Sequence, residues 1–472
     1  MGDVRKFDIC VIGAGSGGLS VAAGASQMGA SVVLIEKAKM GGDCLNTGCV
    51  PSKAMLAAGH AAQAHRRSGR FGVEAAEPAI DANGVYGHIH AVIAAIEPND
   101  SVERFEGMGV TVIKGHARFA GPREVEVNDV RISARRFVIA TGSSPFVPPI
   151  PGLDAVEFYT NETIFEADVL PSHLIVIGGG PIGIEMAQAH RHLGAKVTVL
   201  EMFTVMPKDD PELVSVVRRQ LAQDGIDILE GVSIDSVGKT ANGVAVTLKG
   251  ENKTIEGSHI LVATGRRANV HGLGLEEAGI DFSDKGINVD GRLRTSDKKV
   301  FAIGDVAGGL QFTHVAGYHA GVVIKNALFR LPAKADTRTV PWVTYTTPEL
   351  AQVGLTEAEA RKSHRDIRVL RWPFHDNDRA QAEADSDGMV KAVVTKKGHI
   401  LGCGIAGAQA GDLIQTWVLA MSQKTKIGAI AQMIAPYPTR GEASKRAAGS
   451  FYTPSLFSER TRKIVRFLRL FG

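Results

Sequence analysis

The chain has 472 residues, which is the length of about three domains. Its 44% hydrophobic residues, 22% charged residues and 54 glycines are typical of a soluble α/β protein with a large core. A net charge of +3 is too small for nucleic-acid binding to be the main task, and four cysteines are too few for a secreted disulfide framework. With no signal-peptide pattern and no apolar run long enough to span a membrane, we expect a cytoplasmic protein without nucleic-acid partners.

The first motif is a glycine-rich turn between a predicted strand at 7–12 and a predicted helix at 17–28. Its glycines allow a tight turn, the close approach of a pyrophosphate and close helix–strand packing; they are Gly13, Gly15 and Gly18. A second strand at 31–35 is closed by Glu36, whose carboxylate suits a ribose. This spacing predicts a dinucleotide-binding domain. Cys10, inside the first strand, is expected to be buried and inert.

A pair of cysteines follows in the segment GGDCLNTGCVPSK at 41–53. Cys44 and Cys49 lie just before a predicted helix at 51–62, and a helix N-terminus favours thiolate over thiol. Cysteines placed soon after a dinucleotide-binding turn can face a bound cofactor, which indicates redox chemistry. The alternatives are a structural disulfide, a metal site or two buried thiols; we predict no resident metal.

The next segment alternates helices and short strands and ends in a second turn of small residues. We predict helices at 53–67 and 85–108 and strands at 110–114, 125–127, 130–132 and 137–140. The last strand runs into Thr141 and Gly142, a turn that lets the backbone approach a cofactor closely. A proline-rich stretch at 144–152 then indicates a domain boundary.

Beyond this boundary the strand–turn–helix–strand pattern repeats. Gly178, Gly180 and Gly183 follow a predicted strand at 174–177. Gly178 lies 165 positions after Gly13, and Glu201 lies 165 positions after Glu36, so the repeat keeps its internal spacing. Two such domains in one chain imply two bound dinucleotides.

The acid that closes the second repeat indicates which nicotinamide nucleotide binds. A carboxylate suits a free 2′-hydroxyl and repels a 2′-phosphate, so Glu201 predicts NAD(H) rather than NADP(H). The nearby cations Lys208 and Arg266 are the features that would favour NADP(H). Arg266 follows Gly265 in a Thr-Gly turn that repeats the one at 141–142.

The rest of the chain holds one more small-residue turn and no third dinucleotide motif. A strand at 300–303 ends at Asp305, which could accept a hydrogen bond from a polyol or be an ordinary turn residue. His314 stands at the start of a predicted helix at 311–328, and a polar boundary follows at 331–340. Further strands are predicted at 342–345, 367–371, 390–394 and 400–405, and helices at 356–362 and 411–422. Cys403 is expected to be in the core.

The last segment, 461–471, is basic and amphipathic. Ile464, Phe467, Leu468 and Phe471 share one helical face, and Arg462, Arg466 and Arg469 share the opposite face. We expect a helix packed on the end of the chain; weak contact with a membrane surface is the alternative.

Together these motifs resemble those of the class I pyridine nucleotide–disulfide oxidoreductases, the flavoprotein family of dihydrolipoyl dehydrogenase, glutathione reductase and mercuric reductase. The most specific parts are the segment at 41–53, the two glycine motifs, both Ala-Thr-Gly turns and AIGD at 302–305. The resemblance implies an α/β homodimer with two Rossmann-like domains and a C-terminal α+β dimerisation domain. Its implied division is an FAD-binding domain at 1–150, an NAD(P)-binding domain at 151–270, a return to the FAD domain at 271–338 and the dimerisation domain at 339–472.

The resemblance also implies roles for single residues. Cys49 would be the charge-transfer thiol beside the flavin, and Cys44 the interchange thiol that meets substrate. Lys53 would lie near flavin N5 and pair with Glu185, because an isolated buried charge is costly. The implied cofactor-binding residues are Gly13, Gly15, Gly18, Glu36 (adenosine ribose), Lys53, Thr141, Gly142, Gly178, Gly180, Gly183, Glu201, Gly265, Arg266, Asp305 (ribityl chain) and His314 (helix start that supports charge on the reduced flavin).

One departure from the family pattern concerns the substrate. Disulfide reductases carry His-Pro near the C-terminus with Glu five residues after the His; here Tyr437 replaces the His, whereas Glu442 is retained. The family's His-Pro peptide is cis, so we expect a cis Tyr437–Pro438 bond. His can shuttle a proton near neutral pH, whereas Tyr stays mainly a hydrogen-bond donor.

Three functions follow from this reading. The first is a dihydrolipoyl dehydrogenase-like enzyme that passes electrons from NAD(P)H through FAD and the cysteine pair to a small-molecule or protein thiol/disulfide. The second, favoured by Tyr437, is mercuric reductase-like reduction of a soft metal ion or another small electrophile. The third is a redox-sensing protein that binds FAD and NAD with little turnover.

Overall fold

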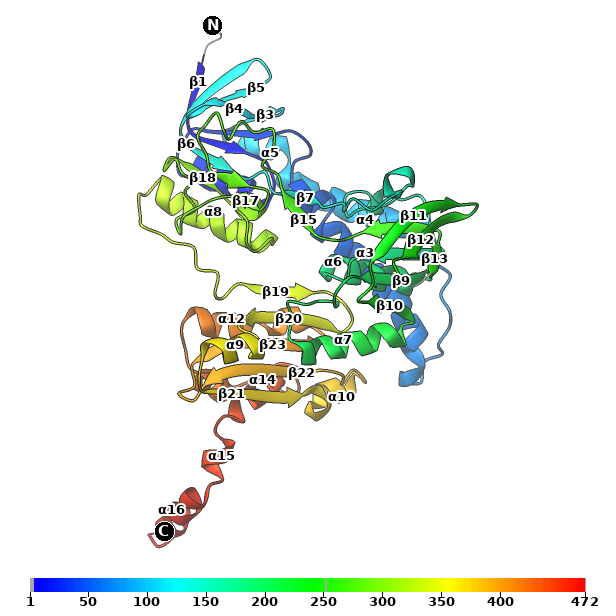
Figure 1. Ribbon diagram of the computed structural model, residues 1–472. Helices are drawn as coiled ribbons and strands as arrows, with labels where there is room; N and C mark the ends of the chain where they lie inside the picture. Colours follow the sequence, from blue (N-terminus) through cyan, green and yellow to red (C-terminus); the bar gives the residue numbers. More distant parts are fainter. Residues whose placement is uncertain (1–3, 251–252, 472) are drawn as a thin grey trace. The chain divides into compact units, whose positions relative to one another are not determined.

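The computed structural model describes residues 4–250 and 253–471, which fall into two compact units. The first unit comprises 1–62, 79–202 and 232–336, and the second comprises 63–78, 203–231 and 337–472 (Figure 1). Both units combine sheets with helices, so the predicted α/β class is confirmed.

The main sheet of the first unit is built around β1 (Val4–Ile12). The strand order is β3 (Val110–Lys114), β2 (Val32–Glu36), β1, β6 (Val130–Ile139), β5 (Glu124–Val127) and β4 (Arg118–Gly121), and β18 (Val300–Ala302) also pairs with β6. β1, β2, β3, β6 and β18 pair in parallel, whereas β4 and β5 form an antiparallel edge. The chain therefore returns to its N-terminal sheet at β18. The helices α1 (Ser16–Gln27) and α8 (Thr313–Ala327) pack against each other.

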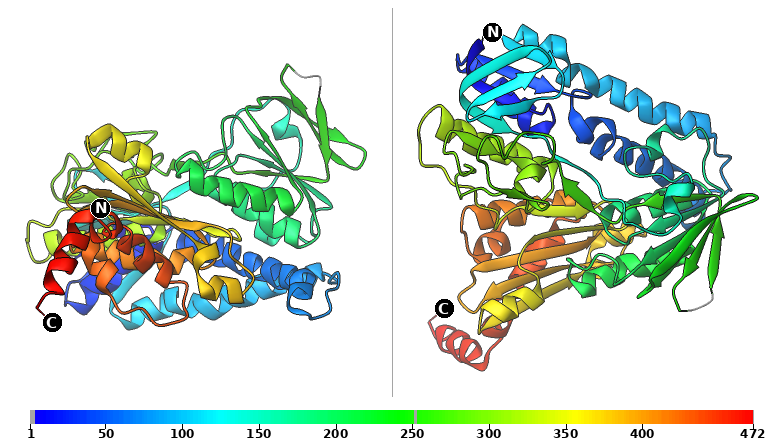
Figure 2. Two further views of the ribbon diagram at one scale, coloured as in Figure 1. Left: turned by 90° about the horizontal axis from the view of Figure 1, so that it is seen from below. Right: turned by 45° about the horizontal axis from the view of Figure 1, so that its top comes forward.

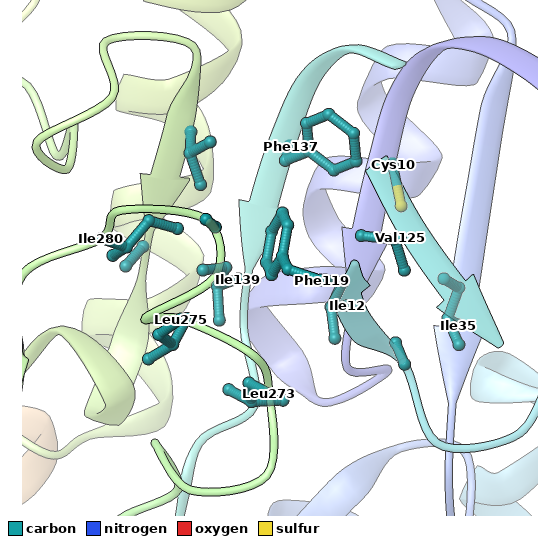
Figure 3. Close-up of a cluster of buried hydrophobic side chains, with 14 of the residues drawn as sticks. Cys10, Ile12, Ile35, Phe119, Val125, Phe137, Ile139, Leu273, Leu275 and Ile280 are labelled. Atoms are coloured by element: carbon teal, nitrogen blue, oxygen red, sulfur yellow. The ribbon is translucent and has the colours of Figure 1, made fainter. Parts of the chain in front are cut away.

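A buried apolar cluster joins this sheet to a distant segment of the same unit (Figure 3). Phe119 and Phe137 lie at its centre, with ring centroids 5.5 Å apart and planes tilted by 54°. Leu275 and Ile280 pack against them from the segment that follows the second repeat, and Cys10 is fully buried in the same cluster, as expected. Burial of these side chains fixes the returning segment to the first sheet.

The second repeat folds as the sequence predicts. β8 (His173–Ile177) pairs in parallel with β9 (Lys196–Glu201) and β14 (His259–Val262), and the helix α6 (Pro181–His192) follows the glycine turn. A three-stranded antiparallel sheet, which was not predicted, stands beside it; its strands are β11 (Ile234–Thr240), β12 (Gly243–Leu248) and β13 (Thr254–Gly257).

The second unit contains a five-stranded antiparallel sheet (Figure 2). Its order is β19 (Pro341–Thr344), β20 (Glu349–Gly354), β23 (Ile400–Gly407), β22 (Met389–Thr395) and β21 (Ile367–Pro373). The fully buried Cys403 and Trp417 lie in one apolar core with residues of α13 (Ile427–Gln432) and α14 (Glu442–Gly449). α7 (Pro211–Gln223) packs on β20 and β23.

The remaining regular elements complete the description of the chain. They are α2 (Gly42–Asn46), α3 (Cys49–Arg67), α4 (Ala82–Ile96), α5 (Val102–Gly107), β7 (Ser143–Pro145), β10 (Ile226–Glu230), β15 (Arg266–Ala268), β16 (Phe282–Ser283), β17 (Gly286–Ile287), α9 (Glu357–Ser363), α10 (Asp378–Ala382), α11 (Ala410–Leu413), α12 (Gln415–Ser422), α15 (Thr453–Leu456) and α16 (Glu459–Leu468).

Several predicted elements differ from the structure. The helix predicted at 85–108 is two helices, because a 3₁₀ turn containing Pro98 interrupts it and Ser101 caps the second one by accepting a hydrogen bond from the Arg104 N–H at 3.2 Å. The strands predicted at 130–132 and 137–140 are one continuous β6. The strand β20 was not predicted. The expected cis Tyr437–Pro438 bond is confirmed.

We expect Phe119→Ala to lower the free energy of unfolding of the first unit by about 3–5 kcal/mol, because it leaves a cavity between Phe137 and the returning segment. Phe119→Leu keeps most of the volume and should cost less than half as much. Urea titration followed by far-ultraviolet circular dichroism measures both. Equal midpoints for the two variants would contradict a tightly packed cluster.

Candidate active site

In the glycine turn of each repeat, the backbone approaches a neighbouring backbone segment so closely that a side chain would not fit at the first glycine. A Cβ at Gly13 would lie 2.4 Å from the Ala140 carbonyl oxygen, and one at Gly178 would lie 2.4 Å from that of Ala263. Both glycines have positive φ, +105° and +111°, which non-glycine residues rarely adopt. A Cβ at Gly18 would lie 1.8 Å from the Gly13 oxygen. The first helical turn therefore lies directly on the strand end, with Gly15 and Gly180 as the N-caps of α1 and α6.

The acids that close the second strands bind these turns. Glu36 Oε2 accepts a hydrogen bond from the Ala14 N–H at 2.6 Å, and Glu201 Oε2 accepts one from the Gly179 N–H at 2.6 Å. The second oxygen of Glu36 accepts from the Ala38 N–H at 2.7 Å. Because a carboxylate oxygen has two lone pairs, each acid can hold its turn and still accept from a ribose hydroxyl.

The cysteines lie at the starts of two consecutive helices. Cys44 is in the short helix α2, which was not predicted, and Cys49 is the first residue of α3. Both are thiols in this structure; Cys49 is exposed and Cys44 is half-buried. The Thr313 hydroxyl lies 3.4 Å from Cys49 Sγ. Cys44 and Cys49 lie within hydrogen-bond distance of each other, and Thr313 at the start of α8 interacts with both.

The pKa values of the two thiols are shifted in opposite directions. A hydrogen bond from Cys44, the Thr313 hydroxyl and the nearby Lys53 ammonium lower the pKa of Cys49 from 9.0 to about 6, against burial and the Asp43 carboxylate. The same hydrogen bond to Cys49, together with burial, raises the pKa of Cys44. In the reduced pair, Cys49 is thus the thiolate and Cys44 the thiol that donates to it.

The expected ion pair beside the cysteines is present. Lys53 lies one helical turn after Cys49, and its Nζ is 2.7 Å from Glu185 Oε2. Glu185 is buried in α6, within the second repeat. The pair therefore joins the cysteine helix to the helix of the second dinucleotide motif.

Arg266 is the centre of a polar cluster that sequence reasoning did not foresee. Its guanidinium donates to the Ser143 hydroxyl at 2.7 Å and to the Ser143 carbonyl at 2.8 Å, and it lies 3.3 Å from Asp43 Oδ1. The Ser143 hydroxyl in turn donates to Asp305 Oδ2 at 2.6 Å. Asn161 donates to Asp43 at 3.0 Å. Ser143, Asp43 and Asn161 were not predicted as site residues, although Asp43 lies within the cysteine segment at 41–53 and Ser143 directly follows the turn at 141–142.

The two small-residue turns and the 3₁₀ turn at 304–307 meet around this cluster. Asp305 is mostly buried, and burial raises the pKa of its carboxyl group, partly offset by Ser143 and Arg266. Thr141 donates to the Asn269 carbonyl at 2.8 Å, which ties the first turn to the end of β15. Gly142 and Gly265 both have positive φ. His314, the second residue of α8, stacks on Phe312 with centroids 5.3 Å apart.

Tyr437 and Glu442 belong to the second unit. Tyr437 is 71% exposed, and its hydroxyl donates to Asp378 Oδ2 at 2.8 Å, which raises the pKa of the phenol. The buried Arg440 binds Glu383 at 2.8 Å and the Asp385 carbonyl at 2.9 Å. These contacts of Arg440 hold the segment that contains Tyr437 in place. Glu442 is the first residue of α14. Within the described ranges, no group of three or more His, Cys, Asp or Glu side chains is placed to hold a metal ion.

Comparison with known proteins bears on this arrangement. The family model described as pyridine nucleotide-disulphide oxidoreductase matches residues 7–320, and the dimerisation domain of that family matches 340–448. A mercuric reductase of Lysinibacillus sphaericus is 34% identical over 451 residues, covering 94% of this chain and 83% of the relative. A dihydrolipoyl dehydrogenase of Bacillus subtilis (strain 168) is 36% identical over 455 residues, covering 94% and 96%. The structure of the HOCl-induced flavoprotein disulfide reductase RclA from Escherichia coli superposes with a TM-score of 0.84 at 28% identity, covering 94% of this chain and 99% of that one.

Two dinucleotide-binding folds beside a close cysteine pair define a flavin-dependent oxidoreductase with a disulfide redox centre. The chain belongs to the pyridine nucleotide-disulphide oxidoreductase family. It is accordingly an enzyme that uses FAD and a pyridine nucleotide, and its dimerisation domain indicates a homodimer. The resemblance inferred from the motifs is confirmed.

We expect the Cys49 thiolate in the reduced protein to titrate with a midpoint at about pH 6. Below this pH the thiol is protonated, so its ultraviolet thiolate absorbance should disappear. The measured quantity is the ultraviolet absorbance of the reduced protein minus that of its reduced Cys49→Ser variant. Thr313→Val removes one hydrogen bond to the sulfur and should raise the midpoint; a midpoint near 9 in the unaltered protein would contradict the assigned acidity.

Proposed function

We propose that this enzyme passes electrons from NADH through FAD to the Cys44–Cys49 disulfide and on to a small-molecule or protein thiol/disulfide. The observation that carries the proposal is the pair itself. Cys49 is a stabilised thiolate one helical turn from the Lys53–Glu185 pair, in the same unit as both glycine turns. A protein that only binds dinucleotides would need neither the thiolate nor the buried ion pair.

The first repeat has the features that FAD requires. Its turn has no room for a Cβ at Gly13 or Gly18, so backbone N–H groups at the start of α1 are open to a pyrophosphate. Glu36 would bind the adenosine ribose and Asp305 the ribityl chain. We assign FAD to 1–150 and 271–338, the nicotinamide nucleotide to 151–270 and dimerisation to 339–472. Bound FAD would supply a two-electron relay between the nicotinamide and the cysteine pair.

The surroundings of the second turn support NADH over NADPH. Glu201 ends β9 at the position where a ribose 2′-hydroxyl is bound in such folds, and its charge repels a 2′-phosphate. Arg266, one of the two cations that would favour NADPH, is occupied by Ser143 and Asp43. Its guanidinium is therefore better suited to holding the active-site turns together than to binding a phosphate.

The reduced cysteine pair can carry out dithiol–disulfide exchange in two steps. Once deprotonated, Cys44 attacks one sulfur of a substrate disulfide, forms a mixed disulfide and releases the first substrate thiolate. The Cys49 thiolate then attacks Cys44 Sγ, which closes the Cys44–Cys49 disulfide and releases the second thiolate. Two electrons pass to the substrate, and both leaving thiolates take up protons.

The step that is hard to achieve in this exchange is removal of the proton from Cys44. Its pKa is raised by the bond to Cys49, so the first attack requires a base. In the family, the histidine of the dimerisation domain serves the partner subunit's site. Here that position is Tyr437, whose hydroxyl already donates to Asp378 and whose own pKa is raised. Tyr437 is therefore a poor base, and exchange with dihydrolipoamide should be slow.

A second candidate function is reduction of a soft metal ion or small electrophile, as the name of the mercuric reductase relatives suggests. The specific observation in its favour is Tyr437. Thiolates bind soft cations directly. Unlike disulfide exchange, this reaction releases no substrate thiolate that must then be protonated. The lack of a proton shuttle is then a smaller handicap than in disulfide exchange.

We expect NADH titration of the purified holoenzyme to produce a long-wavelength absorbance band from the Cys49 thiolate beside the flavin. Cys49→Ser should abolish the band, whereas the matched Cys44→Ser variant should keep a band without NADH. NADPH should react about tenfold or more slowly, since Glu201 repels its phosphate. Absence of the band in the unaltered enzyme would refute the proposed relay; a band without turnover on any acceptor would favour a redox sensor.

We further expect Tyr437→His to raise turnover of dihydrolipoamide at least about tenfold, because it restores a group that titrates near neutral pH. Tyr437→Phe, which removes the bond to Asp378 without adding a base, is the matched control and should not raise the rate. Steady-state NADH formation measures both. If the His variant turns over no faster than the unaltered enzyme, residue 437 does not limit thiol exchange.

A further inference from the structure

The C-terminal helix α16 has no place in the chemistry above. It begins at Glu459, beyond residue 448 where the match to the dimerisation domain ends. Ser458 caps it by accepting a hydrogen bond from the Thr461 N–H at 3.2 Å. In Figure 1 and in the right view of Figure 2, α16 extends away from the sheet of the second unit. α16 is therefore an N-capped helix that projects from the second unit.

No side chain of α16 is buried, contrary to the expected packed terminal helix. Ile464, Phe467, Leu468 and Phe471 are 49–75% exposed on one face. Phe467 and Phe471 contact each other edge to face, with centroids 5.2 Å apart. A contiguous apolar face of this kind is rarely left in water without a partner.

The opposite face is strongly basic. Between 459 and 472 the sequence has five basic residues and one acid, Glu459, so this segment carries a net charge of +4. Arg462, Arg466 and Arg469 form a row opposite the apolar side chains. Among the residues that the structure describes, no ion pair involves the basic side chains of this helix. Its positive charge is therefore uncompensated within the chain.

We propose that α16 docks the enzyme on an anionic lipid bilayer, lying in the plane of the interface. An apolar face with aromatic and aliphatic side chains, bordered by arginines, fits acyl chains below and lipid phosphates above. A second copy of the helix is a worse partner, because it would bring two segments of the same net charge together. No helix in the described part of the chain is long and apolar enough to cross a membrane.

The test uses full-length holoenzyme and vesicle flotation at low salt. Vesicles rich in phosphatidylglycerol should carry the protein, and vesicles of phosphatidylcholine alone should not. The triple variant Arg462→Gln, Arg466→Gln, Arg469→Gln should lower partitioning about 100-fold, since each arginine near an anionic surface contributes about fivefold. Phe467→Ser with Phe471→Ser should also lower partitioning onto the anionic vesicles, because it removes aromatic side chains that would contact the acyl chains.

Controls separate docking from folding and from dimerisation. The variants should keep NADH oxidation and the molar mass of the unaltered enzyme, measured by light scattering. Replacing the exposed Lys396 and Lys397, which lie far along the chain in a turn of the second unit, should leave vesicle binding unchanged. Equal binding to neutral and anionic vesicles, or no binding to either, would overturn the proposal. So would a lower molar mass on removal of 459–472, since that result would assign the helix to a contact between two copies.

Discussion

The ion pair between Lys53 and Glu185 is the contact on which the active site depends. Removing a carboxylate from water is costly unless a cation compensates it, so the buried Glu185 fixes the position of Lys53. This holds α3 against α6, and the close approach continues at Gly59, where a Cβ would lie 3.2 Å from the His192 Cβ. Because α3 begins at Cys49, the same pair sets the place of the thiolate. The hydrogen bond from Cys44 lowers the pKa of that thiol most and the Lys53 charge lowers it further, so the ion pair also contributes to the acidity of Cys49.

The repeated turns show why the sequence keeps its glycines and acids at one spacing. In each repeat the glycine N–H binds the end of the second strand, at 2.8 Å for Gly13 to Ile35 O and 2.9 Å for Gly178 to Leu200 O. The acid then reaches back to the next N–H of the turn. A side chain larger than hydrogen at either glycine would push the turn away from the end of the neighbouring strand, at Ala140 or Ala263, and weaken both bonds. The spacing of 165 residues is thus preserved by identical local geometry, with different dinucleotides assigned to the two sites.

Those features were predictable because they depend on short-range chemistry. The glycine turns, Glu36 and Glu201 and the cysteine pair follow from motifs that carry their own physical reason, whereas the partnership of Lys53 with Glu185 was implied by the family resemblance and is present in the structure. Ser143, Asp43 and Thr313 were missed because they matter only through tertiary contacts with Arg266, Asp305 and Cys49. The strand β20 was missed because no turn or alternation marks its short segment. The prediction that the C-terminal helix packs on its own chain was wrong. An amphipathic pattern indicates that a helix has a partner surface, but it does not identify that surface.

The change at Tyr437 is chemical rather than structural. Its segment is held by Arg440 against Glu383 and by Asn377, which donates to the Thr439 carbonyl at 3.0 Å; neither contact involves the ring at 437. These two contacts do not depend on whether residue 437 is His or Tyr. In the proposed mechanism, the residue at 437 decides whether a thiol can lose its proton at neutral pH. A dithiol substrate requires that step in both directions, whereas a cation captured by thiolates requires it only once. Within one scaffold, the acidity of a single exposed side chain can thus separate thiol exchange from the reduction of other acceptors.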